Sequence, residues 1–311
     1  MRLAYESLSS VLAVRIAVFE KQHEALLGIA DEAARGVFVQ QLVDSVKRET
    51  HFAQLLARPL SESVTDPRSI DFDPLRAAIV HKRNEHLGES FWMAFLFTHF
   101  GKSRKYAWGY PRVVYGRFGS EPVDWWTWES VYSDPTAFQY WLHESRERIQ
   151  AEPGGFGNHR KYTSLDALGD RGTGAAVVTY TEFVASRGGT QESTFGSVDG
   201  ESPEARFDRL YKAMKVIGSF GRTAKFDHLT TLRRLGLANI RPPHTYMEGA
   251  TGPLKGARLL FDGDLQSSMT RREAQEKFVT LGGALEVGPD IVEDAACNWQ
   301  KSPLAYKRFT L

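Results

Sequence analysis

Two glycines stand just before a predicted helix in the segment 217–225. The first amides of a helix have no partner within the helix, and the helix dipole gives that end partial positive charge. An oxyanion such as a phosphate therefore fits at this turn. The residues that would border it are Gly218, Gly221, Arg222, Thr223 and Lys225. The same spacing also fits an ordinary tight turn between antiparallel helices.

A polar stripe is predicted near the C-terminus. Helical spacing places Asp294, Asn298 and Lys301 on one face at i, i+4 and i+7, with Glu293 beside it. The opposite face carries Ile291, Ala295 and Trp299 and is expected to point inward. An acid and an amide on such a helix need partners or a solvent-filled pocket, because unpaired buried polar groups are costly.

Asp227 is a second candidate acid, because it lies on the helix that follows the glycine turn. The spacing alone does not choose between Asp227 and Asp294, and Glu293 and Glu248 stand behind them.

An irregular, glycine-flanked segment offers binding groups at residues 158–162. Loops on a rigid scaffold commonly carry such groups. Its polar members are Asn158, His159, Arg160, Lys161 and Tyr162. Capping by Asn158 is the structural alternative. No spacing typical of a metal site occurs, and the lone Cys297 excludes a cysteine-built zinc centre, so we expect no metal and no cofactor.

The elements that would position these residues are helices. Apolar residues recur at helical spacing through residues 10–57 and 75–100, and residues 91–97 are apolar nearly all round, as in a core helix. Residues 207–217 and 226–235 have one apolar face each and enclose the glycine turn. Residues 188–203 are polar and predict an exposed loop. The sequence therefore predicts a mainly α fold with irregular loops.

Composition limits the function classes. The 311 residues are 42% apolar, enough for a large core, and the proline-bearing stretch 59–74 is the best linker candidate. We expect an N-terminal helical segment (1–75) packing on a main domain (76–311). The net charge is only +1, so binding to nucleic acid would depend on local basic patches such as Lys102, Arg104 and Lys105. No signal peptide or membrane span is evident, which predicts a cytoplasmic protein.

The turn resembles the hairpin of helix-hairpin-helix DNA glycosylases, whose usual form is Leu-Pro-Gly-x-Gly-x-x-Thr-Ala. Here the glycines of Gly218-x-x-Gly221-Arg-Thr-Ala are one residue further apart. No aspartate stands near residues 242–244, where that superfamily has its acid. Arg222 replaces the lysine of bifunctional members, so the resemblance implies a glycosylase without a lyase step.

A closer resemblance covers roughly residues 80–303. Four strings in order resemble the alpha-glutamyl/putrescinyl thymine pyrophosphorylase family, a divergent branch of the same superfamily. They are Phe156-Gly-Asn-His-Arg-Lys-Tyr162, Phe220-Gly-Arg-Thr-Ala-Lys-Phe-Asp227, Tyr246-Met-Glu-Gly-Ala-Thr-Gly-Pro-Leu254 and Glu293-Asp-Ala-Ala-Cys-Asn-Trp-Gln-Lys-Ser-Pro303. The resemblance implies one of two activities, thymine hypermodification or antiviral excision of glucosylated hydroxymethylcytosine from phage DNA.

Excision needs a carboxylate beside C1′ of the sugar and a pocket for the flipped base. We therefore expect a monofunctional DNA glycosylase, with double-stranded phage DNA carrying modified bases as its partner and no obligate protein partner. Asp294, Asp227 or Glu293 would be the acid. The base pocket would use Asn158, His159, Tyr162, Tyr246 and Asn298, and the DNA backbone would contact the glycine turn, Arg160 and Lys161. The alternatives are amine-for-pyrophosphate exchange on a hydroxymethyl pyrimidine and a non-catalytic DNA-binding module.

Overall fold

A computed structural model describes residues 2–160 and 162–308, with side chains from residue 7 onward. Across the described residues the chain forms 14 α-helices and no strand, and 63% of it is helical, which confirms the predicted mainly α class. The contacts divide the chain into two compact units, residues 1–53 with 242–311 and residues 54–241. The predicted domain boundary after residue 75 and the helix-hairpin-helix relationship stay predictions. None of the described helices combines the length and hydropathy of a membrane span.

The first unit joins the two ends of the chain around one core. Its helices are α1 (Arg2–Gln22), α2 (Glu32–Ala57, which runs past the unit's boundary), α12 (Gly252–Ala257), α13 (Arg271–Ala284) and α14 (Pro289–Trp299). α14 buries Ile291, Ala295 and Trp299, and the Trp299 ring meets Phe38 edge-on at 5.5 Å. The predicted inward face of α14 is thus confirmed, and its polar stripe lies on the other side.

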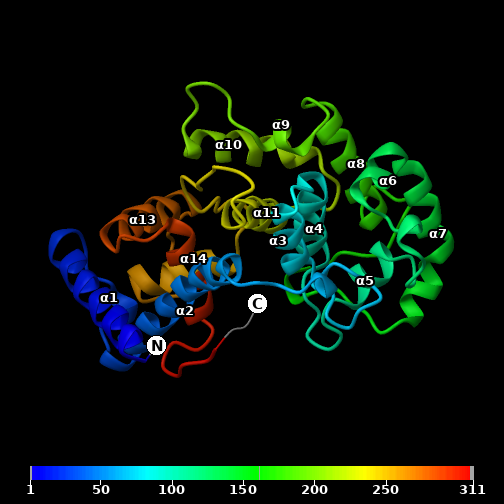
Figure 1. The fold of residues 1–311 in the computed structure, drawn as a ribbon. Coiled ribbons are helices and arrows are strands. Elements are labelled where there is room, and N and C mark those ends of the chain that lie inside the picture. The colour runs from blue at the N-terminus through cyan, green and yellow to red at the C-terminus, as the bar shows by residue number, and fades with distance from the viewer. Residues whose placement is uncertain (1, 161, 309–311) are drawn as a thin grey trace. The chain divides into compact units, whose positions relative to one another are not determined.

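The second unit is built around α4 (Leu87–Phe100), which packs against α3 (Pro74–Arg83) and α11 (Arg222–Arg234) (Figure 1). Every side chain of residues 90–96 is buried, as the apolar run predicted. Burying a large apolar side chain stabilises a fold by roughly 1.5–3 kcal/mol, so α4 is the main anchor of this unit. The other helices are α5 (Gly109–Tyr115), α6 (Trp128–Ser133), α7 (Pro135–Ala151), α8 (Thr173–Ala185), α9 (Gln191–Phe195) and α10 (Pro203–Ala213).

The glycine turn lies between two helices, as its flanking patterns predicted. α10 continues as a 3-10 turn to Val216, the chain turns through residues 217–221, and α11 begins at Arg222. Ser219 has a φ of 59°, a left-handed conformation that allows the sharp reversal. α11 ends before Gly236, whose φ is 64°.

One expectation for this unit is wrong. The stretch 188–203, predicted as an exposed loop, contains α9. The Thr190 side chain accepts a hydrogen bond from the Ser193 amide and caps the helix, and Phe195 is fully buried against Phe91, with ring centroids 5.5 Å apart. The polar pattern hid this helix, because the buried face of α9 includes Gln191 and Thr194 as well as Phe195.

Candidate functional site

Asp227 and Arg160 form an ion pair that joins two of the segments singled out by the sequence. Arg160 Nη2 donates to Asp227 Oδ2 at 2.8 Å. The Asp227 side chain is 43% exposed, whereas that of Arg160 is only 7% exposed. The accessible carboxylate of Asp227 is therefore bound by the buried guanidinium of Arg160.

The guanidinium is fixed by its other hydrogen bonds. Arg160 Nε donates to the Thr98 carbonyl at 2.5 Å and Nη1 to the His159 carbonyl at 3.1 Å. Because three nitrogens bind three different groups, the guanidinium plane has one orientation, and it orients Asp227 Oδ2 in turn. Asp227 Oδ1 makes no hydrogen bond to any residue that the structure describes, so one carboxylate oxygen can face a substrate.

The glycine turn is anchored by aromatic stacking. Phe220 stacks on Phe95 at 5.3 Å and on His99 at 6.4 Å. The Gly218 amide donates to Thr179 Oγ1 at 2.7 Å, so Gly218 serves the packing of the turn. Gly221, by contrast, is exposed and provides no side-chain cap for α11.

Arg222, Thr223 and Lys225, the other candidates for phosphate contact, lie in the first helical turn of α11. Arg222 and Thr223 are half-buried. Lys225 Nζ lies 4.2 Å from the centre of the Tyr211 ring, and burial lowers the pKa of Lys225. The sequence candidates for backbone contact thus gather at one helix end, although their role in DNA binding stays a prediction.

Two buried histidines lie beneath the ion pair. His99 Nε2 is 3.0 Å from Thr173 Oγ1, and burial, together with the nearby charge of Arg160, lowers the pKa of His99 to about 3. Burial likewise lowers the pKa of His228 to about 3. Both rings are therefore neutral at neutral pH, and the charges near this layer are those of Arg160 and Asp227.

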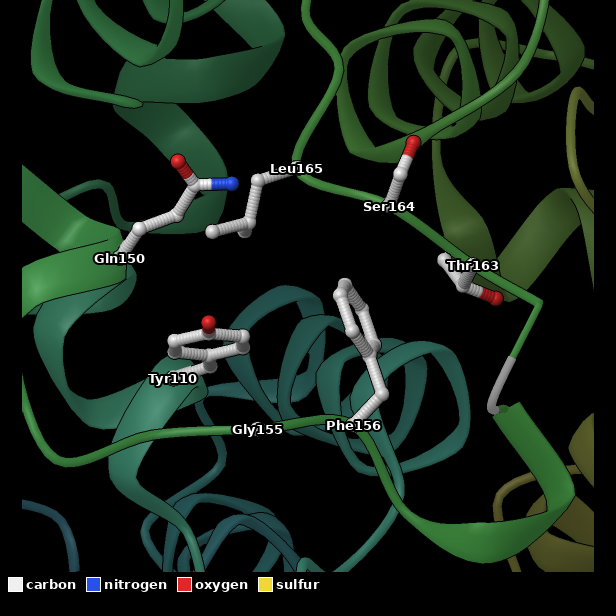
Figure 2. A pocket seen from close by; sticks show the side chains of 7 residues that line it. All are labelled: Tyr110, Gln150, Gly155, Phe156, Thr163, Ser164 and Leu165. Carbon is white, nitrogen blue, oxygen red and sulfur yellow. The ribbon is translucent and has the colours of Figure 1, made fainter. Parts of the chain in front are cut away.

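A cavity of about 420 Å³ lies beside the segment that carries Arg160. Figure 2 shows the rings of Tyr110 and Phe156 on one side, with Gln150 and Leu165 across from them. The rings meet edge to face at 5.5 Å. The cavity is wide open to solvent. Its volume is within the range of small-ligand sites, and the two rings and the Gln150 amide give it a mixed apolar and polar lining.

The cavity and the ion pair share one segment of backbone. Phe156 lines the cavity, and the Arg160 amide donates to the Gly157 carbonyl at 2.8 Å. The Thr163 amide donates to the Arg160 carbonyl at 2.8 Å, and Thr163 lines the cavity again. A short turn therefore places the acid's partner next to the cavity wall.

Close packing beside the cavity leaves no room for a side chain at two glycines. A Cβ on Gly154 would lie 2.0 Å from the Tyr110 ring, and one on Gly109 would lie 2.0 Å from the Pro153 carbonyl oxygen. Glycine is required at both positions because any side chain would separate α5 from the segment after α7.

The expected pocket residues of this unit lie around the same turn. Asn158 and His159 are exposed in a 3-10 turn, and the Tyr162 side chain is 91% exposed. Lys161 lies outside the described residues. Their assignment to a base pocket stays a prediction.

The acids of the first unit lie in a different environment. Asp294 Oδ2 accepts from Ser45 Oγ at 2.7 Å and from Arg48, and Asp294 Oδ1 accepts from Asn298 Nδ2 at 3.1 Å. Lys301 Nζ donates to Asn298 Oδ1 at 2.9 Å, so the predicted stripe forms a connected network. Both oxygens of Asp294 are engaged by protein groups, which is typical of a structural carboxylate.

Glu293, Asn298 and Tyr246 are also buried in the first unit. Tyr246 has a φ of 47°, and its amide donates to His244 Nδ1 at 3.2 Å. These residues and Asp227 belong to separate compact units, so the structure describes two candidate environments rather than one.

Sequence reasoning missed most of the cavity. Tyr110, Gln150, Thr163 and Ser164 carried no signal, because they come from segments whose proximity only the fold creates. Phe156 could have been found, since it opens the first family-like string. Among the described residues no group of three or more His, Cys, Asp or Glu side chains could hold a metal ion.

Comparison with known proteins gives one match. Neither a search of curated proteins nor a search of solved structures found a similar chain. The family model described as alpha-glutamyl/putrescinyl thymine pyrophosphorylase clade 3 matches residues 33–311, which include both candidate environments. The match covers most of the chain, and the chain therefore belongs to the alpha-glutamyl/putrescinyl thymine pyrophosphorylase clade 3 family.

Proposed function

We propose that this protein is a monofunctional DNA glycosylase that removes a bulky modified pyrimidine, such as glucosylated hydroxymethylcytosine, from phage DNA. The observation that carries the proposal is Asp227, an accessible carboxylate oriented by the buried Arg160 on a turn that borders an aromatic cavity. Loss of such bases leaves abasic sites, which would make the activity an antiviral defence.

The base would enter the cavity after leaving the helix stack. Base flipping costs a few kcal/mol, which stacking on aromatic rings and hydrogen bonds to the base edge offset. Tyr110 and Phe156 supply the rings, and the Gln150 amide can both donate and accept. The volume of about 420 Å³ leaves room for a substituent on the base.

Asp227 would act on the sugar. When the C1′–N bond breaks, its electron pair leaves with the base and the sugar becomes oxocarbenium-like. The carboxylate stabilises this positive charge, and it orients the water whose oxygen forms the new bond to C1′. The water gives up a proton to the carboxylate or to solvent, and the released base takes up a proton from solvent. Arg160 keeps the carboxylate in place without touching the substrate.

The start of α11 would hold a phosphate of the same strand. Its first amides point out of the helix end, and Gly221 leaves that end open because it has no side chain. Arg222 and Lys225 add positive charge there, and Thr223 offers a hydroxyl. Because Asp227 lies on the same helix, a phosphate at its start would bring the nucleotide near the acid.

The test uses three DNA substrates, carrying glucosylated hydroxymethylcytosine, hydroxymethyluracil or no modification. After incubation, abasic sites are counted and released bases are identified by mass spectrometry. Base release from the glucosylated DNA alone is the expected result. The absence of base release from all three substrates would refute the glycosylase proposal.

The family name favours a second candidate, exchange of pyrophosphate on a hydroxymethyl pyrimidine for an amine. In that reaction the C1′–N bond survives, and the base gains the mass of the amine. DNA bearing a pyrophosphorylated hydroxymethyl base would then show a mass shift without abasic sites, dependent on added amine. DNA binding with neither product would indicate a non-catalytic module.

A further inference from the structure

A short basic loop borders the cavity on the side of α5. Residues 101–107 carry three cations within four positions, Lys102, Arg104 and Lys105, and all three are exposed. The loop is closed by the Ser103 amide, which donates to the Ala107 carbonyl at 2.8 Å, and Ala107 has a φ of 47°. This hydrogen bond closes the segment into a short loop that carries all three cations.

None of these cations forms an ion pair with a residue that the structure describes. Several other surface cations of this chain do have a carboxylate partner, for example Arg68 with Asp66 and Lys212 with Asp208. Since the whole chain has a net charge of only +1, the loop is a local excess of positive charge.

The loop is attached to the same segment as the cavity and the ion pair. A Cβ on Gly155, which lines the cavity, would lie 3.3 Å from Ser103 Oγ and 3.9 Å from the Tyr106 ring. Just before the loop, the Phe100 carbonyl accepts from the Gly157 amide at 2.8 Å. One backbone hydrogen bond and the side chains of Ser103 and Tyr106 therefore place the loop next to the cavity wall.

We propose that the loop 101–107 binds the phosphate backbone of DNA beside the cavity, as a second contact in addition to the start of α11. Lysine and arginine side chains bind phosphates without reading sequence, and this suits a loop that positions a strand. Tyr106, 37% exposed beside the cavity, supplies a ring next to the cations. The choice of DNA as the ligand rests on the proposed function.

The test is the salt dependence of DNA binding by a triple variant, Lys102→Ala, Arg104→Ala and Lys105→Ala. Each phosphate contact adds about 0.9 to the slope of log K against log salt, so the slope should fall by roughly 2 to 3. At about 0.1 M salt the same loss corresponds to roughly 100- to 1,000-fold weaker binding. Fluorescence anisotropy with a labelled duplex of the unmodified sequence measures both quantities.

The matched control removes three cations that already have carboxylate partners, Arg68→Ala, Lys212→Ala and Arg272→Ala. It changes the net charge equally, and we expect the wild-type slope. A triple variant that behaves like this control overturns the inference, and so does wild-type protein that binds no DNA. Equal binding of the wild-type protein to acidic lipid vesicles, lost in the triple variant, would also overturn it in favour of a membrane surface.

Base release, measured separately, keeps the two proposals distinguishable. If wild-type protein releases no base yet the slope falls in the triple variant, the loop binds DNA and the glycosylase proposal fails. If base is released and the slopes are equal, the loop inference alone fails.

Discussion

Replacing each candidate acid by its amide separates a catalytic carboxylate from a structural one. In the wild-type protein Arg160 Nη2 lies 2.8 Å from Asp227 Oδ2. In Asp227→Asn the side-chain oxygen can still accept this hydrogen bond, so the geometry is kept and only the charge is lost. Losing one preorganised electrostatic stabiliser costs about 2.7–4 kcal/mol, or roughly 10²–10³ in kcat. Because the side chain is 43% exposed, water screens part of the effect, and we expect about a 100-fold loss.

Asp294→Asn should behave in the opposite way. The carboxylate accepts from Ser45, Arg48 and Asn298, so an amide group places its own donor against one of these donors. Leaving partly buried donors unsatisfied costs about 1–3 kcal/mol. For a domain of this size, each kcal/mol lowers Tm by about 2–4 °C. We therefore expect a clear fall in Tm and a smaller change in the rate of base release.

Two measurements on each purified variant decide the matter. Single-turnover release of glucosylated hydroxymethylcytosine gives the rate of bond cleavage, and a thermal melt gives the stability. Two results together would refute the assignment of Asp227 as the acid. Asp227→Asn would release base at the wild-type rate, and Asp294→Asn would be folded but release no base.

Three further outcomes test the cavity, the packing beside it and a buried acid. Phe156→Ala removes a stacking ring, worth about 1–3 kcal/mol per base, so KM for modified DNA should rise roughly 10- to 100-fold in steady-state assays. Gly109→Ala puts a Cβ 2.0 Å from a backbone oxygen and should lower Tm strongly, whereas Gly221→Ala, with nothing within 4 Å, should melt like wild type. Burial raises the pKa of Glu89 to about 7, so ionising it opposes folding. The protonated Glu89 contributes fully to the free energy of unfolding below the pKa of the unfolded chain, about 4.5. This contribution falls by about 3 kcal/mol as pH rises from about 4.5 to 7. In denaturant titrations between about pH 4.5 and 7, the free energy of unfolding of Glu89→Gln should rise relative to that of the wild type as pH rises. A difference that stays constant with pH would contradict this.

The sequence predicted the parts of the fold that depend on local periodicity. The helix at residues 91–97 and the two helices around the glycine turn were evident, because apolar residues at helical spacing need a buried face. The burial of Phe195 was not evident, since α9 has only five residues and too little sequence for a period.

The candidate acids could not be separated from the sequence. Asp294 is tied to Ser45 and Arg48, which are 249 and 246 positions away along the chain. Asp227 meets Arg160 across 67 positions. Both acids lie on helices, and only contacts between distant segments show which one keeps an oxygen without a protein partner among the described residues.

The same contacts change how the basic residues are interpreted. A cluster of cations in a sequence suggests phosphate binding, but a cation can bind only what its surroundings leave accessible. The guanidinium of Arg160 is buried and binds Thr98, His159 and Asp227, so its charge acts inward, on the acid. Lys102 and its neighbours are exposed and have no carboxylate partner within the described chain, so their charge acts outward. In a protein with almost no net charge, this division would allow one segment to orient the proposed catalytic acid while the adjoining loop attracts a DNA strand, as proposed above.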